Sequence, residues 1–545
     1  MKIRSLRPLS LPLALLLAAP LMSAGVAHAA DGVPLVPPGS SGFEWGSMEN
    51  PDLSGPSLAF EAYEVSMPLN RNVWLWNTAT GLRHRIGDDM PTAMTSDISQ
   101  RNAAVADVRA PDGSRSVHVV WQQIHENSPF SDNDIWIWRG DRRGNVDEGF
   151  PRQLVTGPTG SHQYRPNIGL TRTPSGNQLV VAWADDRDSP GGAVRVRWLN
   201  LSADADKDGV PDYLDQGFST ITAGRLADPG AKLGTNQDEP VVGPRGILWV
   251  DLRGDNSMDK AKAVYRLDLG VRPPAVRRFW VSSGAVTPWS LRATGSGGAW
   301  LGPGIAGAPY LPWSRAVGGK AGVFTVLADA GEFDVVAQRF ALTGGHAGAT
   351  DGDPDVYYFD RVTGQNVPVC SVGESPRNKL KMQVRPTIGL APGGARVVWM
   401  DSRHPQNTPS TDPQSLVYKL YVALVPTVKA ATSRTTVRLG TKVRLTAQVA
   451  PDFRGNPVKF QRGKRDVLED PYLLGGSLPT YFGWKAMKTK DLEKGSTVSW
   501  AWKPKKKGTY FVRVWFKGGS RYTDVGDRKV PHVGNTSKVL RIVVR

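Results

Sequence analysis

The stretch "RPTIGLAPGGARVVWMDSR" (Arg385 to Arg403) contains two runs of strand-forming residues separated by a Gly/Pro turn, which predicts a β-hairpin. It recurs as "RPNIGLTRTPSGNQLVVAWADDR" (Arg165 to Arg187) and "EPVVGPRGILWVDLR" (Glu239 to Arg253). These three copies end in Trp-x-Asp-x-Arg. A weaker copy, "NAAVADVRAPDGSRSVHVVWQQIH" (Asn102 to His125), has Gln and His in place of Asp and Arg. Self-similarity of this kind predicts a series of equivalent β units.

A second pair of strands follows several of these hairpins, as in the segments that begin at Asp134, Ala263 and Asp355. Four strands in roughly 60 residues are typical of a propeller blade. The tryptophans at 121, 183, 249 and 399 are spaced by 62, 66 and 150 residues. The last gap fits two repeats, with a degenerate copy near Ala321 to Val336 that lacks the tryptophan.

Two segments at the ends of this region, Asn72 to Gly87 and Ser415 to Val425, each predict half a blade, a strand pair without its partner pair. We expect them to share a closing blade, because closure removes the exposed sheet edges. The sequence therefore predicts an all-β chain with a six-bladed β-propeller over residues 60–427, after an N-terminal extension of residues 30–59. Five or seven blades are the alternatives.

The repeated pattern, together with "DPDVYYFDRVTGQNVPV", resembles TolB-type six-bladed propellers and related cell-surface propellers over roughly residues 60 to 425. The resemblance implies the architecture alone, because propellers serve unrelated functions.

Residues 428–545 have a different pattern, with strands such as "TTVRLGTKVRLTAQV" and "GTYFVRVWFKGGSRY" between turns. Pro504 and Gly508 to Tyr510 resemble the turn that precedes a long strand in bacterial Ig-like domains, which implies an Ig-like β-sandwich. In that strand alternation places Tyr510 and every second residue to Phe516 in the core. Phe511, Arg513 and Trp515 are then expected to face outward.

The chain begins with Lys2, Arg4 and Arg7, then an apolar run from Leu11 to Leu21 and an Ala-x-Ala site ending at Ala29. This arrangement is typical of a secretory signal peptide, predicted for residues 1–29. No later stretch has eighteen apolar residues, so we expect no transmembrane segment and a secreted or envelope-associated protein. With one cysteine the chain forms no internal disulfide.

The segment "DADKDGVPDYLD" is the sharpest chemical signature, because its carboxylates recur at calcium-loop spacing around a central glycine. It resembles a thrombospondin type 3 calcium repeat and predicts calcium as the bound cofactor. The expected ligands are Asp204, Asp206, Asp208, the Val210 carbonyl, Asp212 and Asp215.

A calcium loop of this kind should raise the thermal midpoint of the mature protein, because an ion that binds only the folded state stabilises it. Scanning calorimetry in calcium and in chelator measures the effect. Superimposable curves would contradict the prediction.

Residues 429–545 hold 26 Lys and Arg against 8 Asp and Glu. This excess predicts an anionic envelope polymer as the partner of the C-terminal domain, and nucleic acid is not the expected one. A solubilising basic surface is the alternative. The residues expected to bind the polymer are Lys503, Lys505, Lys506, Lys507, Arg513, Trp515 and Lys517.

No common catalytic signature is found: the sequence lacks G-x-S-x-G, H-E-x-x-H and a P-loop. The repeated Trp-x-Asp-x-Arg favours a structural turn over a catalytic set. These absences favour a non-enzymatic, exported binding or adhesion-type protein, whose propeller binds a protein or polysaccharide and whose basic domain attaches to the polymer. No catalytic residue is assigned. The alternative is a secreted carbohydrate-active enzyme, a glycoside hydrolase or lyase, with carboxylates in the propeller funnel.

Overall fold

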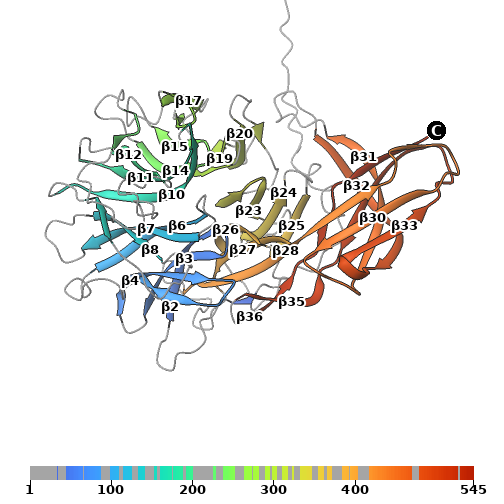
Figure 1. Ribbon diagram of the computed structural model, residues 1–545, viewed down its shortest axis with the longest axis horizontal. Coiled ribbons are helices and arrows are strands. Elements are labelled where there is room, and N and C mark those ends of the chain that lie inside the picture. Colours follow the sequence, from blue (N-terminus) through green and yellow to red (C-terminus); the bar gives the residue numbers. More distant parts are fainter. Residues whose placement is uncertain are drawn as a thin grey trace, which may run out of the picture.

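The computed structural model shows a chain built almost wholly of antiparallel β-sheet (Figure 1). It describes residues 33–34, 45–64, 67–86, 98–109, 115–125, 133–140, 152–155, 160–174, 176–187, 192–200, 225–228, 237–251, 263–272, 274–281, 289–294, 297–303, 310–316, 322–323, 332–345, 354–360, 365–370, 383–391, 393–402, 417–468, 478–525 and 528–545. Within these ranges no helix is long and apolar enough to cross a membrane.

Six four-stranded sheets follow one another along the chain, and each is a meander in which neighbouring strands are consecutive. Blade 1 comprises β2 (Trp45–Ser54), β3 (Ser57–Glu64), β4 (Met67–Asn77) and β5 (Arg83–Arg85). Blade 2 comprises β6 (Ile98–Arg109), β7 (Arg115–His125), β8 (Asn133–Arg139) and β9 (Arg152–Val155). Blade 3 comprises β10 (Gln163–Thr173), β11 (Gly176–Asp185), β12 (Ala193–Asn200) and β13 (Arg225–Leu226).

The next three sheets have the same order. Blade 4 comprises β14 (Gln237–Gly243), β15 (Gly246–Asp251), β16 (Ala263–Asp268) and β17 (Ala275–Val281). Blade 5 comprises β18 (Trp289–Ala293), β19 (Gly297–Pro303), β20 (Tyr310–Ala316) and β21 (Gly322–Val323). Blade 6 comprises β22 (Phe333–Val336), β23 (Arg339–Gly345), β24 (Pro354–Asp360) and β25 (Gln365–Cys370).

Blade 7 is assembled from three parts of the chain. Its first three strands are β26 (Gln383–Ala391), β27 (Gly394–Asp401) and the front half of β28 (Lys419–Thr432). The N-terminal β1 (Val33–Pro34) pairs with β28 antiparallel, and β36 (Arg528–His532) of the C-terminal hairpin pairs with it in parallel at Leu424. Outer pairing of this kind covers the last edge of the propeller.

Seven apolar clusters lie between successive blades, and the seventh joins blade 7 to blade 1. Each blade places the aromatic ring of its second strand against the blade before it. The tryptophans of blades 2, 3, 4, 5 and 7 and the phenylalanine of blade 1 are at most 1% exposed: Trp121, Trp183, Trp249, Trp300, Trp399 and Phe60. This regular burial shows that the described sheets close into a ring.

The fold class predicted from the sequence is confirmed as an all-β propeller chain. The preferred count of six blades is wrong, because the described part of the propeller has seven, one of the two alternatives. The gap between Trp249 and Trp399 holds two short blades instead of one. Trp300 marks the first of them, and Leu342 takes the tryptophan's place in the second. Asn72 to Gly87 is not half of a shared blade, because β2 and β3 complete blade 1 from Trp45, ahead of the expected boundary at residue 60.

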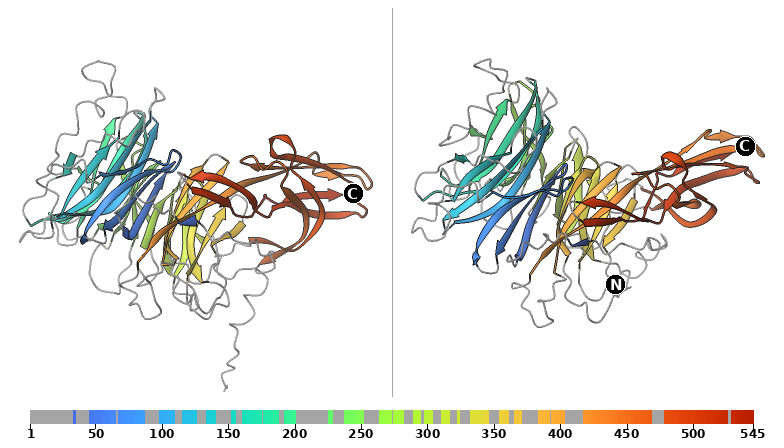
Figure 2. Two further views of the ribbon diagram at one scale, coloured as in Figure 1. Left: turned by 90° about the horizontal axis from the view of Figure 1, so that it is seen from below. Right: turned by 60° about the horizontal axis from the view of Figure 1, so that its bottom comes forward.

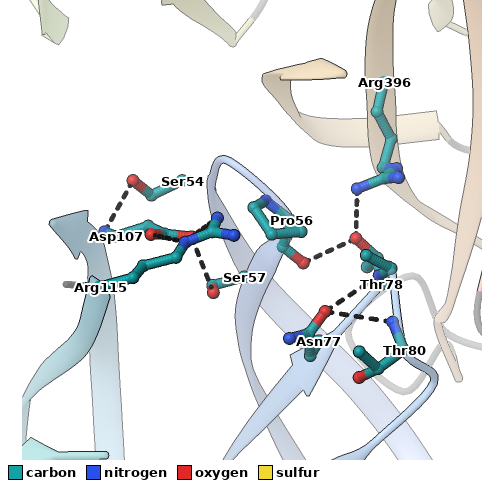
Figure 3. A network of polar contacts seen from close by, with 10 residues as sticks. Ser54, Pro56, Ser57, Asn77, Thr78, Thr80, Asp107, Arg115 and Arg396 are labelled. Carbon is teal, nitrogen blue, oxygen red and sulfur yellow. Dashed lines mark hydrogen bonds and ion pairs between the residues drawn. The ribbon is translucent and has the colours of Figure 1, made fainter. Parts of the chain in front are cut away.

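Polar contacts reinforce the junction of blades 7, 1 and 2 (Figure 3). Arg396 of β27 donates to the Thr78 hydroxyl, which itself donates to the Pro56 carbonyl at 2.6 Å. Asp107 of β6 is ion-paired with Arg115 and accepts from the Ser57 hydroxyl of blade 1 at 3.3 Å. Burial lowers the pKa of Arg396 to about 10, which still leaves it charged at neutral pH.

The C-terminal region is a two-sheet β-sandwich beside the propeller, coloured orange to red (Figure 2). One sheet pairs the rear half of β28 with β30 (Val443–Ala450) and β33 (Thr497–Trp502). The other contains β29 (Thr436–Val437), β38 (Leu540–Val544), β34 (Gly508–Phe516), β31 (Pro457–Leu468), β32 (Leu478–Asp491) and β37 (Asn535–Thr536). The remaining elements are β35 (Gly519–Val525) and a 3₁₀ turn, η5 (Lys494–Ser496).

Strand β28 belongs to both parts of the molecule. Its first residues pair with β27, and from Thr427 onward it pairs with β30. The sandwich therefore continues directly from blade 7. In β34 Val512, Val514 and Phe516 are buried in the sandwich core, as their alternation predicts. The Ig-like class of this sandwich stays a prediction.

Candidate functional site

The first strand of each blade lies innermost, because these strands contact one another in sequence around the ring, from β2 and β6 through to β26 and back to β2. Side chains at equivalent positions of these strands therefore gather around one axis. This axis is where residues from different blades can act together.

A β-bulge interrupts six of these innermost strands at the same point. The bulge residues have φ angles between 49° and 54°, and they are Asn50, Asn102, Arg165, Glu239, Ser290 and Arg385. A non-glycine residue in the left-handed region costs about 1–3 kcal/mol and persists only where the surroundings enforce it. Bulges also redirect side chains, and all six of these bulge residues are polar.

In blades 1 and 3 the residue two positions beyond the bulge accepts a backbone N–H of the next blade. The Asp52 carboxylate accepts the Val105 N–H at 2.7 Å, and the Asn167 side chain accepts the Val242 N–H at 2.8 Å. The equivalent residue of blade 6, Asp334, accepts from Ile388 N at 2.9 Å. These bonds hold the two carboxylates and the Asn167 amide in fixed orientations at the seams between blades.

Two of these carboxylates, from blades 1 and 6, are close enough to interact electrostatically. Burial first, and then the charge of Asp334, raise the pKa of Asp52 to about 6, against opposing effects of the Val105 N–H and of Arg292. The Asp52 side chain nevertheless remains partly exposed. A carboxylic acid of this kind can hold its proton near neutral pH and still reach a ligand.

Asp334 has the opposite surroundings. The Arg292 Nε lies 3.3 Å from its Oδ1, and the Thr387 hydroxyl donates to its Oδ2 at 2.8 Å. Together with the Ile388 N–H, these groups place one cation and two hydrogen-bond donors around the carboxylate. The arginine side chain is 40% exposed, so its remaining N–H groups are accessible.

Arginine 292 also faces a third carboxylate, from blade 4. Burial raises the pKa of Glu239, while Arg165 and Arg292 oppose that shift. Arg165 of blade 3 is ion-paired with Asp238, which precedes Glu239 on β14, and the arginine side chain is 49% exposed. Arginines and carboxylates therefore alternate around the axis from blade 3 to blade 6, which suits a polar ligand with both hydroxyl and charged groups.

A further group of charges lies on the blade 7 and blade 1 side. The Arg385 Nε is 3.5 Å from the Glu332 carboxylate, whose Oε2 accepts the Arg385 N–H at 2.9 Å. Arg71 donates to Glu49 at 2.8 Å. Buried Glu61, whose pKa burial raises, accepts from Asn50 and from the Asn102 N–H. The Arg385–Glu332 and Asn102–Glu61 contacts join neighbouring blades and the others lie within blade 1, so we assign them all to the framework.

The Trp-x-Asp-x-Arg residues lie away from this cluster, inside the blades. The indole N–H groups of Trp183, Trp249 and Trp399 donate to the aspartate two residues later at 3.2 to 3.4 Å. Asp185, Asp251 and Asp401 are at most 1% exposed. Their structural role, expected from the repetition, agrees with this burial.

The predicted calcium ligands, residues 204 to 215, lie outside the described residues, so the calcium loop stays a prediction. The part of the chain that the structure describes contains no cluster of three or more metal-binding side chains.

The structure does not bring the predicted polymer-binding residues into one patch. Lys503, Lys505, Lys506 and Lys507 are exposed on the turn before β34, and Lys517 is exposed just after that strand. The two ends are roughly 30 Å apart at the rise of a β-strand. Arg513 lies between them, and it is 8% exposed instead of facing solvent.

Sequence reasoning singled out none of the axial residues. Asp52 in "ENPDLS" and Asp334 in "GEFDVV" occupy the place of the threonine in "RPTIGL". The innermost strands of the first and sixth blades diverge too far from the repeat to be aligned with it by sequence. The equivalence of Asp52 and Asp334 was therefore not visible before the structure.

Comparison with known family models and with curated protein sequences gave no match. Several solved structures are similar at low identity. The propeller domain of the Trilobed protease from Pyrococcus furiosus matches with 11% identity and a TM-score of 0.40, covering 70% of this chain and 95% of that one. The sialidase of Trypanosoma rangeli matches with 10% identity and a TM-score of 0.36, covering 91% and 88%.

An α-L-arabinofuranosidase of Fusarium graminearum is also similar, with 10% identity, a TM-score of 0.35 and coverage of 73% and 98%. These similar proteins are enzymes or parts of enzymes, which corrects the expectation that the chain is not an enzyme. Likeness at this level concerns fold, so the chemistry has to be argued from the side chains.

Proposed function

We propose that the protein is an exported carbohydrate-active enzyme, a glycoside hydrolase, with its active site on the propeller axis. One observation supports this most: Asp52, with its raised pKa, lies near Asp334, which is ion-paired with Arg292. Glycoside hydrolysis requires a carboxylic acid that gives a proton to the leaving oxygen and a second carboxylate that stays charged.

In this proposal Asp52 is the proton donor. Asp334 stabilises the positive charge that develops on the sugar ring, or activates the attacking water. Arg292 orients Asp334 and leaves N–H groups for substrate hydroxyl or carboxylate groups. The polysaccharide ligand expected on the propeller becomes the substrate.

The pH dependence follows from the direction of the Asp52 shift. A donor must be protonated, and its raised pKa of about 6 keeps Asp52 protonated below that pH. We expect kcat/KM to fall by a factor of ten for each pH unit above about 6. Initial rates between pH 4 and 9 measure this alkaline limb, and a rate that rises through that range would exclude Asp52 as the donor.

The proposal is tested with the mature chain and a panel of neutral and acidic polysaccharides, by the release of reducing ends. Elimination, the lyase alternative, leaves a carbon–carbon double bond that absorbs ultraviolet light. Asp360→Asn is the matched control, because this carboxylate of blade 6 also lies near an arginine, Arg339, but on the third strand. The control should keep full activity. No turnover on any polymer, or equal loss in Asp360→Asn, would contradict the proposal.

A further inference from the structure

The outer face of the sandwich sheet formed by β32, β31 and β34 combines aromatic rings with basic groups. We define the aromatic–basic face by its residues Lys459, Trp484, Phe511, Arg513, Trp515 and Arg541. We propose that the aromatic–basic face binds an acidic polysaccharide, with the sugar rings on the indoles and the carboxylates on the basic side chains.

Cross-strand register brings these residues together. Lys459 is directly opposite Trp515, and its Nζ lies 4.9 Å from the centre of the indole ring. Arg541 is directly opposite Phe511, and it is exposed. The face therefore has basic groups on both sides of the aromatic rings of β34.

Trp484 is held flat by two neighbours. The Arg513 guanidinium stacks over its ring at 4.0 Å and donates to the Gln461 side chain at 2.8 Å. A side chain at Gly463 would come within 2.9 Å of the ring, so only glycine allows the indole to lie against β31. A rigid, partly exposed indole is a platform for the apolar face of a sugar.

Burial under Trp484 lowers the pKa of Arg513 to about 9, so it remains charged at neutral pH. It acts as a positioning residue for the indole, while Lys459 and Arg541 provide the positive charge nearer the surface. None of the six residues is acidic, and residues 429–545 carry 26 basic against 8 acidic residues. Charge complementarity therefore selects an anionic polymer.

An acidic polysaccharide fits better than nucleic acid for two reasons. The predicted signal peptide of residues 1–29 would export the chain from the cytoplasm, away from most nucleic acid. The aromatic–basic face also has only three aromatic rings, held in one sheet, which suits stacking against a few sugar rings. This inference does not depend on catalysis, because it concerns binding by the other domain.

The test measures binding of the full chain to polygalacturonate by affinity electrophoresis, with dextran as the neutral polymer and single-stranded DNA as competitor. We expect Trp484→Ala to weaken binding about tenfold, as the loss of one stacked ring implies. Arg541→Gln removes an exposed charge without touching the core, and we expect it to weaken binding several-fold in low salt.

The matched control is the triple variant Lys505→Gln, Lys506→Gln, Lys507→Gln, which removes three charges from the turn before β34. It should bind within about twofold of the unmodified chain. The proposal would be overturned if this variant lost as much binding as Trp484→Ala, or if dextran retained the chain as well as polygalacturonate does. It would also be overturned if DNA displaced the chain at a lower concentration than free polygalacturonate, or if polygalacturonate did not retain the chain at all. The Asp52→Asn variant should bind normally, which separates this outcome from that of the catalytic proposal.

Discussion

Replacing Asp52 by asparagine is expected to lower kcat/KM by about 10²–10⁴, the usual contribution of a general acid. Asparagine keeps the size of the side chain and an oxygen that can accept the Val105 N–H, but it has no proton to donate. The alkaline limb near pH 6 should disappear from the residual activity, because the group that produces it is gone.

The same variant provides its own test of folding. The pKa of the Asp52 carboxyl is raised in the folded state, so ionisation of this group destabilises the folded protein. The stability that the protonated group contributes is fully present below its unfolded pKa of 3.8, and it is lost as the pH rises through about 6. A neutral amide escapes this cost. We therefore expect Asp52→Asn to melt no lower than the unmodified chain at pH 7, by differential scanning fluorimetry.

Replacement of Asp334 gives a contrasting result. Asparagine at 334 leaves the Arg292 charge without its carboxylate, so both rate and substrate affinity should fall. Full activity in both Asp52→Asn and Asp334→Asn would place the active site elsewhere.

Replacing Trp399 by alanine is expected to lower the free energy of unfolding by about 3–5 kcal/mol. Its indole is fully buried between blades 6 and 7, packs on Tyr421 with ring centres 6.1 Å apart, and donates to Asp401. The change leaves a cavity in the cluster and removes the indole N–H donor from a buried carboxylate, two costs that add.

Urea unfolding followed by tryptophan fluorescence measures this loss. Trp280→Ala is the matched control, because Trp280 is only partly buried where it contacts Trp300. We expect it to cost less than half as much. Similar losses in the two variants would mean that burial between the blades does not determine the stability of the propeller.

Local sequence pattern determined much of this architecture. Trp-x-Asp marks a second strand because the indole and the carboxylate lie on the same side of a strand and bond to each other inside the blade. The alternation of Val512, Val514 and Phe516 determined which side of β34 is buried. Both signals work because they depend on neighbours only two residues apart.

The blade count, the axial cluster and the aromatic–basic face were decided by tertiary structure. Blade 6 has Leu342 at the position where most blades have tryptophan, so the sixth blade lacks the repeat's clearest mark. Arg513 alternates outward as its sequence predicts, but Trp484 of another strand covers it.

Asp52 and Asp334 are far apart in the chain and lie in the two blades least like the repeat. Their chemistry exists only because closure of the ring brings blade 1 back beside blade 7, within electrostatic range of blade 6. Sequence alone determined that this protein repeats a β-sheet unit. The long-range packing of those units determined which carboxylates meet, because a pKa depends on the charges and solvent around a group and not on its neighbours in the chain.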